Sequence, residues 1–149
     1  MKLATALSQR AALQTKLSEL STRLNNNAKT QEGEKPAEDP EELLKQTDRI
    51  LVQLEDLIAR INLRNSRTVD GGVTLTERLA KRDVLSKRLS VMRSFLDSSS
   101  EKVTRYAKTE IRIVSTVDVA KLQKQTDALS ADLRALDERI QTLNWTVDL

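Results

Sequence analysis

The chain has 149 residues, of which 38% are hydrophobic but only 2% aromatic, and its formal net charge is +3. It contains no cysteine and no histidine, which excludes disulfides and thiolate chemistry and removes the commonest general base and metal ligand. Zinc, copper and haem sites are therefore not expected.

A core without aromatic residues must be built from Leu, Ile, Val and Ala, and Leu favours helices. The three glycines and two prolines leave few places where a helix can end. Neither a signal peptide nor an apolar run of roughly 18 residues is recognisable. We expect a single helical domain over residues 1–149 in a cytoplasmic protein.

The first predicted helix covers about residues 3–24 and carries a heptad pattern typical of a coiled-coil seam. One heptad position holds Leu3, Leu17 and Leu24 with Arg10 interrupting it, and the complementary position holds Ala6, Leu13 and Leu20. Residues 25–40 then form a long polar loop.

The end of that loop is a helix start signal, since Asp39 suits the cap and Pro40 the first helical position. The second helix is predicted to run to about residue 64. Its two core rows are Leu43, Ile50 and Leu57, and Leu54 and Ile61. A further row of Leu44, Leu51 and Ile58 widens the apolar stripe, which suits a bundle core.

Residues 65–73 break the pattern, with a turn signal at Asp70-Gly71. Val69 and Val73 are placed to flank a short β-hairpin, and a plain helix–helix connection is the alternative. The segment 74–77, Thr-Leu-Thr-Glu, matches a capping box for the next helix.

The third helix is predicted to end at about residue 96, and it has two apolar faces. Its main face holds Leu75, Leu79, Leu85, Leu89, Met92 and Leu96. Val84, Val91 and Phe95 fall roughly opposite, so they are the candidate oligomer interface. Packing against the segment that follows is the alternative for this second face.

Residues 98–117 are interpreted as an extended strap lying across the bundle, and residues 115–118 as a cap for the fourth helix. That helix carries one row of Leu122, Leu129, Leu136 and Leu143 and a second of Leu133 and Ile140. The predicted fold is an all-α antiparallel four-helix bundle, with a pair of coiled-coil hairpins completed by oligomerisation as the alternative. Trp145 is expected to tie down the tail.

Two groups of polar residues are candidate sites. The loop carboxylates Glu32, Glu34, Glu38 and Asp39 are the ligand type of a hard cation, but their spacing matches no EF-hand, and solvation and capping explain them. No metal site, cofactor or catalytic residue is predicted, and we expect no enzymatic activity.

Residues 78–112 hold 10 basic against 4 acidic side chains. The candidate basic patch within them consists of Lys102, Arg105, Tyr106, Lys108 and Arg112. An aromatic among cations is able to stack on a base, so RNA or the ribosome is an alternative partner. Anchoring of the strap by Tyr106 is the structural interpretation of the same residues.

Several short runs resemble a family of small bacterial proteins, mostly uncharacterised, some of which carry the name septicolysin. They are residues 25–27 (Asn-Asn-Asn), 31–40, 61–62 (Ile-Asn), 70–72 (Asp-Gly-Gly), 115–119 (Ser-Thr-Val-Asp-Val) and 144–145 (Asn-Trp). The resemblance covers essentially the whole chain and implies no catalytic residues, while the name implies a membrane-active cytolysin.

Together these patterns favour a non-enzymatic, self-associating helical-bundle protein that serves as a structural or protein-interaction module. A homo-oligomer, with a further protein partner, is the expected assembly. An RNA-binding protein and a cytolysin are the two alternatives.

Overall fold

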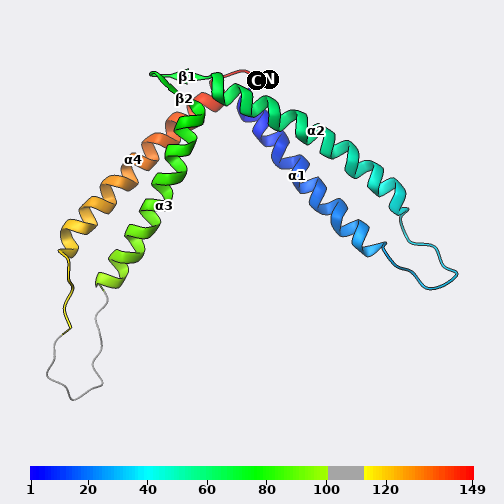
Figure 1. Cartoon of the computed structure of the whole chain (residues 1–149), viewed down its shortest axis with the longest axis horizontal. Helices are drawn as coiled ribbons and strands as arrows, with labels where there is room; N and C mark the ends of the chain where they lie inside the picture. The colour runs from blue at the N-terminus through cyan, green and yellow to red at the C-terminus, as the bar shows by residue number, and fades with distance from the viewer. Residues whose placement is uncertain (101–112) are drawn as a thin grey trace, which may run out of the picture. The chain divides into compact units, whose positions relative to one another are not determined.

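A computed structural model describes residues 1–100 and 113–149, and these residues form four helices and a two-stranded β-hairpin (Figure 1). The elements are α1 (Leu3–Asn26), α2 (Pro40–Arg67), β1 (Val69–Asp70), β2 (Val73–Thr74), α3 (Leu75–Ser100) and α4 (Val119–Thr146). The helices pack as two hairpins, α1 with α2 and α3 with α4, which confirms the predicted all-α class.

The chain divides into two compact units. The first comprises Met1–Thr76 together with Gln141–Leu149, and the second comprises Glu77–Ile140. Each unit thus contains one helical hairpin with its own buried residues.

In the first unit, α1 and α2 are held together by a leucine-rich seam. Leu20, Leu43 and Ile50 form its buried centre. The partly buried Leu13, Leu17 and Leu24 pack against this centre from α1. The heptad rows predicted from the sequence are therefore the rows that meet in the hairpin.

The loop between α1 and α2 is fixed by side-chain hydrogen bonds. Asn27 donates from Nδ2 to the Arg23 carbonyl at 2.9 Å and accepts at Oδ1 from the Glu38 amide at 2.9 Å. The Arg23 guanidinium forms a two-point ion pair with Glu38. Asp39 accepts from the Glu41 amide at 3.0 Å and Pro40 opens the helix, as predicted.

The break after α2 is a β-hairpin, the first of the two predicted alternatives. Val69 pairs with Thr74 and Asp70 with Val73, in antiparallel register. Gly71 and Gly72 both have positive φ, 61° and 79°, which a two-residue type I′ turn requires. The hairpin leads directly into α3.

The two chain ends pair with each other in the first unit (Figure 1). Lys2 and Asp148 form an antiparallel bridge, and the Leu3 amide donates to the Val147 carbonyl at 2.9 Å. The Lys2 ammonium contacts the Asp148 carboxylate at 2.9 Å and lowers the pKa of that carboxyl. Both α1 and α4 are thereby anchored at this end.

In the second unit, α3 contributes the buried Leu89 and Leu96. Polar links to α4 flank them: Arg93 donates to Ser130 at 3.3 Å, and Arg82 lies 4.0 Å from Asp137. The two buried leucines belong to the main leucine face predicted for this helix.

Helix α3 extends to Ser100, beyond the predicted end at residue 96. Ser99 and Ser100 donate their hydroxyls to the carbonyls of Phe95 and Leu96 four residues earlier, at 2.7 and 2.6 Å, so both hydroxyls are satisfied within the helix. The three serines at residues 98–100, which lie beyond the predicted helix end, therefore continue the helix.

Of the predicted strap, residues 98–100 belong instead to α3, and the described residues 113–117 are non-helical. Asp118 accepts from the Lys121 amide at 3.1 Å, which confirms the predicted cap of α4. Ile113 and Val114 are 66% and 67% exposed, so these two side chains do not cover an apolar face as the strap interpretation expected.

Truncating the centre of the first seam is expected to destabilise the protein strongly. Leu20→Ala removes a side chain that is 1% exposed and should lower the free energy of unfolding by about 2–5 kcal/mol. Leu63→Ala is the matched control, because Leu63 on α2 is 49% exposed, and it should cost less than about 1 kcal/mol. Urea titration followed by circular dichroism measures both, and equal losses would contradict this packing.

The Arg23–Glu38 pair is expected to contribute stability that depends on pH. The hydrogen bond from Arg23 lowers the pKa of Glu38 below its ordinary value. Its contribution is therefore complete above the ordinary glutamate pKa and is lost as the pH falls through the lowered value. Glu38→Gln should destabilise the chain at pH 7 and not in strong acid, whereas Glu34→Gln controls for the lost charge. A pH-independent difference would refute this role.

Candidate functional site

The candidate oligomer interface is an exposed strip along α3 in the second unit. Val84 is 66% exposed, Val91 69% and Phe95 46%, whereas Leu89 and Leu96 on the same helix are buried. At 100° per residue the centres of the two sets lie about 130° apart around the helix. We call Val84, Val91 and Phe95 the outer face of α3.

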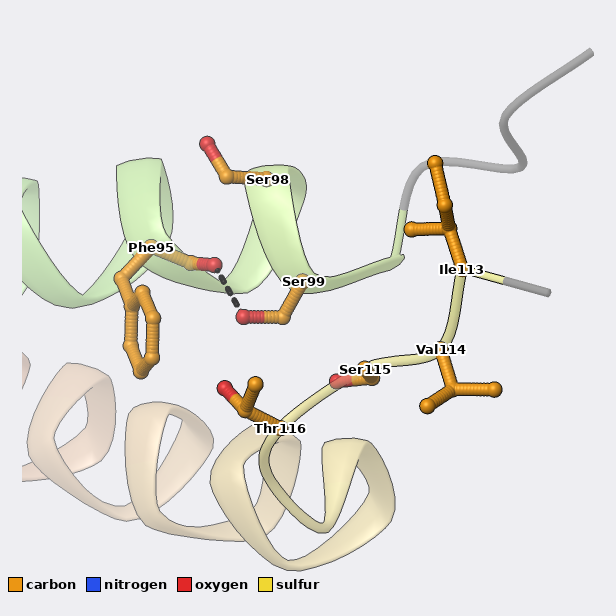
Figure 2. A pocket seen from close by; sticks show the side chains of 7 residues that line it. All are labelled: Phe95, Ser98, Ser99, Ile113, Val114, Ser115 and Thr116. Carbon is orange, nitrogen blue, oxygen red and sulfur yellow. Dashed lines mark hydrogen bonds between the residues drawn. The ribbon is translucent and has the colours of Figure 1, made fainter. Parts of the chain in front are cut away.

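This strip reaches a pocket at the end of α3 (Figure 2). The pocket has a volume of about 270 Å³ and is lined by Phe95, Ser98, Ser99, Ile113, Val114, Ser115 and Thr116. Figure 2 shows the Phe95 ring on the α3 side and the segment entering α4 on the other. The lining combines apolar side chains with hydroxyls, and none of these seven residues is charged.

Two of the four hydroxyls that line the pocket, those of Ser99 and Ser115, are engaged in local backbone contacts. Ser99 donates to the Phe95 carbonyl at 2.7 Å, a bond drawn in Figure 2. Ser115 contacts both the amide and the carbonyl of Val117, at 3.4 and 3.1 Å. They therefore shape the end of the hairpin, and no acid–base pair is formed among them.

Sequence reasoning missed the serines and threonine of this pocket because it took residues 98–100 as a helix end and residues 115–118 as a cap. The only local signal for this pocket was the presence of hydroxyl residues on both sides of the same connection.

The prediction that Trp145 ties down the tail was wrong. Its side chain is 64% exposed, and the tail is held instead by the Lys2–Asp148 bridge.

The candidate basic patch, Lys102, Arg105, Tyr106, Lys108 and Arg112, lies outside the described residues. Within residues 78–100, the described part of the basic region, Arg82 contacts Asp83 at 3.1 Å and Asp137 at 4.0 Å. Part of that positive charge is thus used inside the hairpin.

Two of the four loop carboxylates have structural roles. Glu38 pairs with Arg23, and Asp39 caps α2. In the part of the chain that the structure describes, no cluster of three or more acidic side chains is arranged to hold a metal ion.

Likewise, no helix among the described residues has the length and apolar character needed to cross a bilayer.

The fold thus defines a class of all-α proteins made of two helical hairpins. No curated protein matches the sequence. The chain belongs to DUF6847, a family of unknown function, whose model matches residues 10–149. It is also similar to a functionally unknown conserved protein from Corynebacterium diphtheriae, known from a crystal structure, with 39% sequence identity and a TM-score of 0.93. That match covers 100% of this chain and 98% of the other.

Proposed function

We propose that this protein is a non-enzymatic, self-associating helical protein that acts as a structural or protein-interaction module, with the outer face of α3 as its contact surface. The observation that carries the proposal is the exposure of Val84, Val91 and Phe95 on a helix whose leucine face is already occupied. Apolar side chains collected on one exposed strip mark interaction sites.

The spacing of these residues suits contact with another helix. Val84 and Val91 are seven residues apart, about 10.5 Å along the helix. Phe95 follows four residues later, on the same side, as the next position of a heptad seam. A second copy placed around a two-fold axis would present the same strip, so six apolar side chains would meet.

The energetics favour a moderate affinity. Full burial of a Val or Phe side chain contributes about 1.5–3 kcal/mol, and these side chains are already partly covered. Association costs about 4–15 kcal/mol in lost rotational and translational freedom. The contribution of six such side chains is of the same order as this cost, so we expect the association to be reversible and not obligate.

The name septicolysin, carried by the resemblance alone, implies membrane lysis instead. Release of dye from anionic and neutral vesicles tests that alternative directly. RNA binding through residues 78–112 is the other alternative, and it requires an affinity that falls steeply with salt.

Placing charge on the outer face should abolish the self-association. The double variant Val91→Asp/Phe95→Asp should remain monomeric in sedimentation equilibrium, because two carboxylates would have to be buried without partners. Ser90→Asp adds a carboxylate to the same helix about 100° away and should associate like the unmodified chain.

This effect should be the same at moderate and high salt, since the contact is apolar. Circular dichroism establishes that each variant keeps its helices. Unchanged association of the double variant would show that the outer face of α3 is not the contact.

A further inference from the structure

A second surface lies on the α3–α4 hairpin and borders the outer face, because its residues Lys81 and Arg88 are three and four positions from Val84 on α3. It is a groove of about 560 Å³ between the two helices. Its floor contains Leu85 of α3 and Leu129 and Leu136 of α4. Its charged rim is formed by Arg78, Lys81 and Arg88 on one side and Asp132 and Arg139 on the other. We call this surface the basic groove.

The residues that line the groove recur at a spacing of seven positions, which is two turns of a helix. Leu129 and Leu136 on its floor are seven residues apart, and so are Lys81 and Arg88 on its α3 wall, about 10.5 Å in each case. Both Lys81 and Arg88 are exposed. A helix that places an apolar row and an acidic row at the same spacing would match the floor and the wall together.

Helix α2 of this chain carries such a pair of rows. Leu44 and Leu51 are 52% and 43% exposed, beside the buried seam. Asp48 and Glu55, also seven residues apart, are exposed on the adjoining row, three or four residues from Leu51. We call these four residues the acidic ridge of α2.

The net charges of the two units are also of opposite sign, negative for the unit with the acidic ridge and positive for the unit with the basic groove. Residues 1–76 and 141–149 hold 11 basic and 12 acidic side chains, a net charge of −1. Residues 77–140 hold 14 basic and 10 acidic side chains, a net charge of +4. Contact between unlike units of two copies is therefore electrostatically favoured over contact between like ones.

We propose that the acidic ridge of α2 in one copy docks in the basic groove of a second copy. Leu44 and Leu51 would cover the leucine floor, while Asp48 and Glu55 would face Lys81 and Arg88. Each copy has one ridge and one groove, so reciprocal docking of two copies would fill all four surfaces, whereas one-way docking would extend from copy to copy.

A helix suits this groove better than a nucleic acid does. Phosphate groups need cations and hydrogen-bond donors, whereas the floor offers three leucine side chains and the far wall includes Asp132. Those leucines gain only from an apolar occupant.

The inference rests on the proposed self-association, but its surfaces exclude Val84, Val91 and Phe95. The two contacts also differ in salt dependence. The attraction between the charged rim and the acidic ridge weakens as ionic strength rises, because exposed charges are screened over about 8 Å at physiological salt. If groove variants weaken self-association and Val91→Asp/Phe95→Asp does not, the basic groove is the contact and the outer face is rejected. If only Val91→Asp/Phe95→Asp weakens self-association, the outer face is the contact and the basic groove is rejected.

The test is a charge exchange between two full-length variants. One carries Lys81→Glu/Arg88→Glu and the other Asp48→Lys/Glu55→Lys. Alone at low salt, each should dimerise with a dissociation constant raised about tenfold or more, because like charges would meet in both contacts. Mixed in equal amounts, they should associate about as tightly as the unmodified chain, since both contacts of the mixed pair are again of opposite sign.

The control is Lys87→Glu/Lys124→Glu, which makes the same change of net charge at exposed positions outside the groove lining. It should leave the dissociation constant within about threefold of the original value. A mixture no tighter than its separate components would overturn the proposal, and so would ridge and groove variants that match the control.

Cross-linking gives a second readout, since the chain has no cysteine of its own. One copy carries Ala135→Cys in the groove and the other Leu51→Cys on the ridge. Mild oxidation of the mixture should give mainly the mixed disulfide dimer. Formation of only like-with-like disulfide dimers would contradict the docking. A chain that is monomeric and binds a single-stranded RNA homopolymer through the groove would contradict it as well.

Discussion

The structure depends on one constraint, which is that over most of its length each helix packs against a single neighbouring helix in its hairpin, the last residues of α4 being held in the first unit. A helix with one partner buries one stripe of side chains, and the burial pattern follows this rule. Leu20, Leu43 and Ile50 are buried in the first hairpin and Leu89 and Leu96 in the second. The apolar residues on either side of these stripes stay partly or largely exposed, and they are the surfaces available for assembly.

Local polar contacts define the hairpins where the core is thin. Asn27 and the Arg23–Glu38 pair hold the first connection, and the cap at Asp39 starts α2. The Gly71–Gly72 turn sets the β-hairpin, and the Lys2–Asp148 bridge joins the chain ends. Each is a short-range interaction of modest strength, so together they specify the geometry and leave the free energy of folding to the leucine seams.

Much of this fold was predictable because it is encoded locally. The heptad rows, the Asp39–Pro40 start and the Asp118 cap all depend on residues within a few positions of one another. The end of α3 was misjudged, because Ser99 and Ser100 bond back to the helix instead of ending it. The same rows are compatible with a four-helix core and with two hairpins, so the sequence left both open.

The candidate surfaces were only partly predictable, for a related reason. The outer face of α3 is a pattern within one helix, so it was found from Val84, Val91 and Phe95. The basic groove joins Lys81 and Arg88 to Leu129 and Leu136, which lie more than 40 positions further along the chain. Periodicity within a single helix carries no information on which residues of another helix lie beside it.

The central claim is that these helices have more apolar surface than one partner covers, so that association completes the fold. Its most direct test is the melting temperature of the unmodified chain as a function of protein concentration. Linkage requires the melting temperature to rise with concentration if the folded chain associates and the unfolded chain does not. A melting temperature that stays constant from low micromolar to near-millimolar concentration would contradict the account.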